Sequence, residues 1–183
     1  MRVFETIKNT NVNGPGNRYC IWLSGCFRNC KGCFNKDTNL YYNGRDISID
    51  SLLEDIKNEK ENIEGVSVSG GEPFYQDSEL ALLLERILNM GLNTLVFSGY
   101  TFSQIKKRSF KAINYCSYLI EGRFISALPS CSTFQGSNNQ RFLELENGEI
   151  KNDLTSVYQD DYNKSLEIII NSDKIISTGF MNF

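Results

Sequence analysis

The chain has 183 residues, 40% of them apolar and 22% charged, which is typical of one soluble globular domain. Its net charge of −3 argues against nucleic acid as the main partner, and no apolar run is long enough to cross a membrane. The first residues lack the apolar core of a signal peptide, so we expect a cytoplasmic protein whose cysteines stay reduced.

Segments typical of strands and of helices alternate between residues 19 and 122, after a stretch of turn-forming residues at 9–17. The expected helices are amphipathic, with apolar residues spaced three and four positions apart. Such alternation predicts βαβ units and a mostly parallel sheet flanked by helices. We expect strands over residues 19–23, 65–69, 93–98 and 118–122, and helices that begin at the N-caps Ser48, Ser78 and Thr101.

The last third of the chain has the pattern of β-hairpins. Asn147-Gly148 is a hairpin turn between two stretches with alternating apolar residues. Residues 166–170 and 174–178 form a second candidate hairpin. We therefore expect a main domain over residues 1–150 and a C-terminal β extension, residues 151–183, packed on the same domain.

The loop after the first of these strands contains three cysteines, Cys26, Cys30 and Cys33, at C-x3-C-x2-C spacing. Three thiolates on one short loop can hold three corners of a [4Fe–4S] cluster, which takes four cysteines when the protein ligates it fully. One iron then lacks a protein ligand, and an open coordination position is typical of a site for chemistry.

Other readings of these cysteines are weaker. A zinc site would need a fourth Cys or His nearby, but the chain has no histidine and Cys20 lies in an expected buried strand. A disulfide would need an oxidising compartment. We expect Cys20 and Cys116 to be buried as small apolar residues, and leave the role of Cys131 open.

Polar or glycine-rich motifs follow the other expected strands. Gly70-Gly71-Glu72-Pro73 follows the second strand, Ser98-Gly99 the third and Glu121-Gly122 the fourth. Because the carboxyl ends of parallel strands meet at one edge of a sheet, these motifs should lie beside the cysteine loop. The first motif could by itself be only a tight turn, and the second only a strand end. Residues 136–141 add Asn, Gln and Arg side chains that could bind a ligand.

The cysteine spacing resembles the signature of the radical S-adenosylmethionine (SAM) enzymes, and Gly70-Gly71-Glu72 resembles their GGE motif. Segments 13–16, 121–124 and 136–141 resemble the activating proteins of anaerobic ribonucleotide reductase in particular. The resemblance implies a partial (β/α) barrel with a [4Fe–4S] cluster on the three cysteines. It also implies SAM contacts from Gly32, Cys33, Phe34, Ser69, Gly70, Gly71, Glu72, Ser98, Asn138 and Gln140, with Gly71→Val filling space that the ligand needs.

The same resemblance implies a reaction and partners. The reduced cluster cleaves SAM, and the 5′-deoxyadenosyl radical takes a hydrogen atom from a glycine Cα of anaerobic ribonucleotide reductase. A low-potential donor, flavodoxin- or ferredoxin-like, supplies the electron. The alternatives are a radical SAM enzyme acting on another glycyl-radical enzyme or on a peptide, and a non-catalytic electron carrier. The chain continues past the point where that family typically ends.

Overall fold

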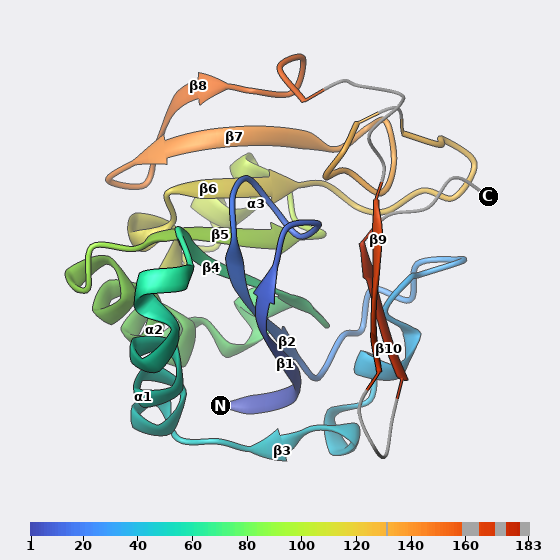
Figure 1. Cartoon of the computed structure of the whole chain (residues 1–183). Helices are drawn as coiled ribbons and strands as arrows, with labels where there is room; N and C mark the ends of the chain where they lie inside the picture. The colour runs from blue at the N-terminus through green and yellow to red at the C-terminus, as the bar shows by residue number, and fades with distance from the viewer. Residues whose placement is uncertain (131, 159–164, 171–174, 180–183) are drawn as a thin grey trace.

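The structure is a computed structural model that describes residues 1–130, 132–158, 165–170 and 175–179. A mixed sheet has the strand order β3-β1-β2-β4-β5-β6-β7-β8, and β9 and β10 form a separate two-stranded sheet (Figure 1). The strands of the large sheet are β1 (Arg2–Thr10), β2 (Arg18–Leu23), β3 (Arg45–Asp46), β4 (Gly65–Gly70), β5 (Asn93–Ser98), β6 (Tyr118–Glu121), β7 (Arg141–Glu146) and β8 (Glu149–Asp153).

The helices lie between the strands, as the alternating pattern predicts. They are α1 (Ile49–Glu59), α2 (Asp77–Asn89) and α3 (Phe102–Lys107), with short 3-10 turns that include Pro73–Gln76. Strands β2, β4, β5 and β6 pair in parallel, and their bounds differ from the predicted ones by no more than one residue. The pairing places their carboxyl ends at one edge of the sheet, as expected.

The antiparallel parts of the sheet were predicted less completely. The hairpin of β7 and β8 is confirmed, with Asn147 and Gly148 in its turn. Strand β1 pairs antiparallel with β2 and was not predicted, because polar residues break its apolar pattern. Its first part buries Val3 and Ile7, and this burial follows from contacts with distant segments.

Two of the three predicted helix caps are confirmed. The Ser48 hydroxyl accepts a hydrogen bond from the Ser51 N–H at 3.1 Å, and Thr101 forms a capping box. Ser78 is wrong as a cap, because α2 already begins at Asp77, directly after the 3-10 turn. The Asp77 carboxylate accepts hydrogen bonds from the backbone N–H groups of Lys111 and Ala112 instead.

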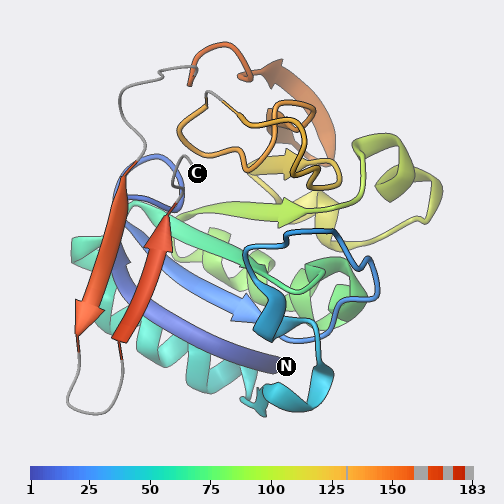
Figure 2. The ribbon, with the colours of Figure 1, turned by 90° about the vertical axis from the view of Figure 1, so that its right-hand side faces the viewer.

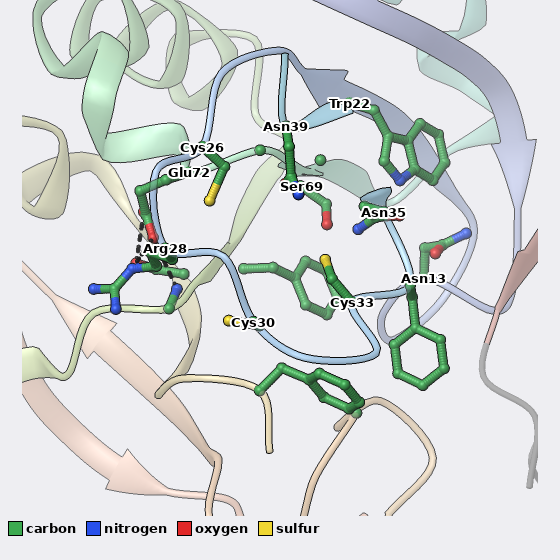
Figure 3. A pocket seen from close by; sticks show the side chains of 18 of the residues that line it. Asn13, Trp22, Cys26, Arg28, Cys30, Cys33, Asn35, Asn39, Ser69 and Glu72 are labelled. Carbon is green, nitrogen blue, oxygen red and sulfur yellow. Dashed lines mark hydrogen bonds and ion pairs between the residues drawn. The ribbon is translucent and has the colours of Figure 1, made fainter. Parts of the chain in front are cut away.

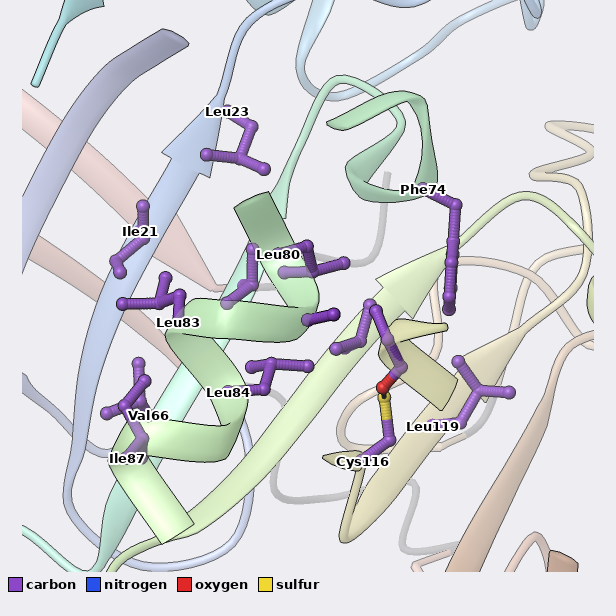
Figure 4. Packing of buried hydrophobic residues seen from close by; sticks show 14 of the residues in the cluster. Ile21, Leu23, Val66, Phe74, Leu80, Leu83, Leu84, Ile87, Cys116 and Leu119 are labelled. Carbon is purple, nitrogen blue, oxygen red and sulfur yellow. Dashed lines mark hydrogen bonds between the residues drawn. The ribbon is translucent and has the colours of Figure 1, made fainter. Parts of the chain in front are cut away.

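The main apolar core lies between the helices and one face of the sheet. Figure 4 shows α2 packed over β2 and β4, with Leu83 and Ile87 directed at Ile21 and Val66. Cys116 is in this core and Cys20 is also buried, as expected, whereas Cys131 lies outside the described residues. None of the helices in the described part of the chain combines the length and apolar character needed to cross a bilayer.

The opposite face of the sheet has a smaller core and an open region. Side chains alternate along a strand, so Leu95 and Phe97 of β5 lie on the other side of the sheet from Val96. Leu95 packs with Ile120, Phe134 and Phe142 in the smaller core. Figure 2 looks onto this face, with the parallel strands behind and loops on either side.

A buried arginine fixes the loop between β1 and β2. Arg18 is fully buried and donates hydrogen bonds to Ser67 Oγ, Asn93 Oδ1 and the backbone oxygens of Pro15 and Val66, at 2.6 to 3.2 Å. Burial lowers the pKa of Arg18 to about 10, so the guanidinium stays charged at neutral pH. Its charge is dispersed over neutral acceptors from two neighbouring strands and the loop.

Replacing Arg18 by Met should destabilise the fold. The variant leaves several buried acceptors without a donor, so the free energy of unfolding should fall by about 3 kcal/mol. Urea unfolding followed by circular dichroism measures this difference. The exposed Arg45 provides the control, since Arg45→Met should change the value by less than about 0.5 kcal/mol. Equal losses in the two variants would contradict this role for Arg18.

Candidate iron–sulfur site

A cavity of about 350 Å³ lies on the open face of the sheet, around the carboxyl ends of β2, β4 and β5. The strand residues Trp22, Ser69 and Phe97 line it because they alternate with core residues on the helix side. Its other lining residues are Asn13, Cys26, Arg28, Cys30, Cys33, Phe34, Asn35, Asn39, Gly70, Gly71, Glu72, Ser98, Gly99, Gly122, Phe124, Gly136, Gln140, Leu166, Ser177, Thr178 and Gly179.

The three predicted ligand cysteines all line this cavity. Figure 3 shows the sulfur atoms of Cys26, Cys30 and Cys33 around the same space, and each residue is partly buried. Backbone hydrogen bonds close the loop at its base, from Gly25 N to Thr38 O at 2.8 Å and from Cys26 N to Asn39 O at 2.9 Å. The loop is therefore held in place by the segment that follows it.

Three thiols that line one cavity suit an iron–sulfur cluster. In the described part of the chain, no group of three or more His, Cys, Asp or Glu side chains could hold one metal ion. The irons of a cubane cluster occupy separate corners, so its thiolate ligands need not converge on one point. Burial raises the pKa of the Cys26 and Cys33 thiols, and metal binding would have to displace their protons.

A buried carboxylate connects the cysteine loop to two strand ends. Glu72 is only 2% exposed. Its Oε1 accepts a hydrogen bond from Ser98 Oγ at 2.8 Å, and its Oε2 accepts one from Gly99 N at 2.9 Å. Burial raises the pKa of Glu72, while these hydrogen bonds and the Arg28 charge oppose the rise. Glu72 therefore joins the turn after β4 to the end of β5.

Arg28 is the cation that faces this carboxylate, and it is not among the site residues predicted from the sequence. Its Nε donates to Glu72 Oε2 at 3.0 Å, and its guanidinium lies 3.9 Å from the ring centroid of Tyr100. Its backbone oxygen accepts a hydrogen bond from Arg123 Nη2 at 2.7 Å. The available signal was a basic residue between two predicted ligand cysteines, together with an acidic residue in the turn after the next parallel strand.

The glycines of the GGE turn allow close backbone approach between loops. A Cβ on Gly71 would lie 2.4 Å from the backbone oxygen of Gly25, and a Cβ on Gly70 would lie 2.5 Å from that of Leu23. Gly70 also has a φ of +97°, which favours glycine. Gly71→Val would therefore displace the cysteine loop, so it is not a specific probe of ligand space as the sequence analysis expected.

The cavity brings together most of the other predicted site residues. Phe34, Ser69, Ser98 and Gln140 line it, whereas Gly32 and Asn138 are exposed and are not among its lining residues. The Gln140 amide is already hydrogen bonded, because Oε1 accepts from the backbone N–H groups of residues 136 and 137 and Nε2 donates to the backbone oxygen of residue 122. Gln140 therefore joins two backbone segments at the cavity, residues 136–137 and residue 122.

Fold and site together define an α/β protein with a three-cysteine site of the iron–sulfur type. A family model described as a 4Fe-4S single cluster domain matches residues 12–143. This match includes the cysteine loop, the GGE turn and the four parallel strands.

Several relatives have the same name, anaerobic ribonucleoside-triphosphate reductase-activating protein. The one from Vibrio cholerae serotype O1 is 30% identical over 139 residues, 70% of this chain and 88% of the relative. The one from Enterobacteria phage T4 is 29% identical over 147 residues, 78% of this chain and 93% of the relative. A Salmonella typhi protein is 29% identical over 137 residues, 70% and 89% of the two chains. The chain belongs to this family of iron–sulfur activating proteins.

Removing Arg28 should expose the cost of the buried Glu72 charge. In cluster-free protein at pH 7, Arg28→Met should lower the free energy of unfolding by about 3 kcal/mol, and adding Glu72→Gln should recover most of it. In Arg28→Met the loss of the positive charge should raise the pKa of Glu72 further. The folded state of this variant then binds a proton at Glu72 more readily than the unfolded state does. Lowering the pH toward 5 should therefore restore part of the stability.

Urea unfolding of the wild type, both single variants and the double variant at pH 7 and pH 5 provides the measurement. A double variant as unstable as Arg28→Met would show that the unpaired carboxylate is not the cause.

Proposed function

We propose that this protein activates an anaerobic ribonucleoside-triphosphate reductase by radical SAM chemistry. The observation that supports it best is the meeting of Cys26, Cys30, Cys33 and the GGE turn at one cavity. A reduced [4Fe–4S] cluster bound there would supply the electron for splitting SAM, which is the chemistry needed to take a hydrogen atom from a glycine of the reductase. The names of the relatives support this choice of partner.

The protein's own contribution is to hold and to orient. The three cysteines would ligate three irons, and among the described residues no further cysteine lines the cavity. Cys20 is excluded from such a role by its burial in β2, where burial raises its thiol pKa to about 12. Ligation by three cysteines would leave one iron of the cluster open for SAM.

The cavity provides polar and aromatic surfaces for the rest of SAM. Ser69 and Asn39 offer hydrogen-bonding groups near the cysteines, and Trp22 and Phe97 offer ring faces for an adenine. The position of the cavity at the carboxyl ends of the parallel strands supports a partial (β/α) barrel of the radical SAM type. The sheet of β2, β4, β5 and β6 would be its wall.

The surroundings of the cysteine loop suit protein partners. Phe27 is 86% exposed and pairs with the Tyr75 ring at 5.6 Å, which places apolar area beside the site. Lys31 and Lys36 are exposed on the loop itself. Their positive charge favours an acidic low-potential electron donor of the flavodoxin or ferredoxin kind.

Anaerobic reconstitution should load about four irons per chain, and the cluster should absorb light at about 400 nm. Alanine at any one of Cys26, Cys30 or Cys33 should abolish both, because three corners need three thiolates. Cys20→Ala is the control, since it removes a buried cysteine from the neighbouring strand and should keep the irons. Iron analysis and visible spectroscopy measure the result, and tight zinc in place of iron would contradict the proposal.

Mixing the reconstituted protein with the anaerobic reductase of the same cell, SAM and a reductant should produce a glycyl-radical doublet in the electron paramagnetic resonance spectrum. The doublet should vanish when SAM is omitted and in Cys30→Ala. SAM cleavage without a doublet, on a reductase that another activase can charge, would instead favour another glycyl-radical enzyme or a peptide as the substrate.

A further inference from the structure

Strands β9 (Leu166–Ile170) and β10 (Ile175–Gly179) form a hairpin beyond the last residue that the family model matches. They pair antiparallel, with Leu166 opposite Gly179 and Ile168 opposite Ser177. Within the described residues, neither strand pairs with the large sheet. In Figure 2 the hairpin stands on one side of the open face and the cysteine loop on the other, with the parallel strands behind.

The base of the hairpin is fixed to the loop between β1 and β2. Asn13 Nδ2 donates a hydrogen bond to Thr178 Oγ1 at 2.7 Å, and the Thr178 hydroxyl donates one to Asn13 Oδ1 at 3.1 Å. Both residues are buried. The backbone N–H of Asn11 donates to Glu167 Oε1 at 2.9 Å. Both strands are therefore attached to the same loop.

That loop is in turn fixed to the sheet. Ser67 Oγ donates to the backbone oxygen of Asn13 at 2.7 Å and accepts a hydrogen bond from Arg18 Nε at 2.9 Å. The buried arginine, the serine, the asparagine and Thr178 form one chain of hydrogen bonds. The hairpin therefore has a defined position relative to β2 and β4.

The hairpin borders the same cavity as the three thiols, and it does so with the edge of β10. Ser177, Thr178 and Gly179 all line the cavity, whereas β9 contributes only Leu166. Successive side chains of a strand point to opposite faces, so three consecutive lining residues mean that the strand's edge, and not one face, is turned to the cavity. Within the described residues, β9 is the only strand partner of β10.

We propose that the free edge of β10 seats an extended segment of the protein substrate in the cavity, facing the cysteines. This inference rests on the proposed function. An edge strand presents a row of main-chain N–H and C=O groups, with which an extended polypeptide can pair along its length. Recognition through the main chain suits a segment whose reacting residue is glycine, since glycine has no side chain to recognise.

The test compares the full chain with a variant that lacks residues 165–183. In the glycyl-radical assay, the deletion should lower the radical formed per SAM cleaved by about tenfold or more. As a readout without the cluster, a fluorescent peptide spanning the reductase's glycine should bind the cluster-free deletion variant at least about tenfold more weakly.

A second pair of variants guards against a folding effect of the deletion. Thr178→Val removes both hydrogen bonds to Asn13 and should weaken peptide binding severalfold. Thr178→Ser keeps the hydroxyl and should bind the peptide with nearly the wild-type affinity. Unchanged peptide affinity and unchanged radical per SAM in the deletion and in Thr178→Val would overturn the inference. A parallel fall of SAM cleavage and radical yield would overturn it too, because the hairpin would then serve SAM.

The two proposals fail in different ways. If the full chain forms no doublet on the reductase, the proposed function fails. If the full chain forms the doublet and the deletion forms it equally well per SAM cleaved, only the role of the hairpin fails.

Discussion

The site depends on the ion pair and the hydrogen bonds that the buried carboxylate of Glu72 forms. This carboxylate would be costly to leave unpaired, and together with its partners it joins three separate strand ends. Arg28 belongs to the loop after β2, Glu72 to the turn after β4, and Ser98 and Gly99 to the end of β5. Satisfying one charge therefore sets the mutual position of the cysteine loop and the wall of the cavity.

Local sequence patterns predicted the elements and part of the site, and long-range contacts account for the rest. Strands β4 and β5 and the hairpins follow from alternation and turn residues, which act over a few positions. Most pairings of β1 with β2, and the pair Arg28–Glu72, join residues more than ten positions apart in the chain. Asn138 and Gln140 were predicted to bind a ligand from their side-chain type, but Asn138 is not among the lining residues of the cavity and the amide of Gln140 is hydrogen bonded within the protein.

Two parts of the chain border the open face of the sheet, and the family model matches only one of them. The family match covers the parallel strands, the cysteine loop and the GGE turn. The β9–β10 hairpin lies outside that match, and yet it reaches the same cavity through Asn13. The matched part of the chain and the hairpin thus border one cavity from two sides (Figure 2).

The contact between Gly25 and Gly71 has an evolutionary consequence. Their backbones lie so close that a methyl group at position 71 has no room beside the oxygen of residue 25. A lineage cannot lose this glycine first and adapt the cysteine loop later, since the intermediate protein would already have displaced that loop. Substitution at position 71 therefore requires a change in the cysteine loop as well, although 45 residues separate the two glycines in the chain.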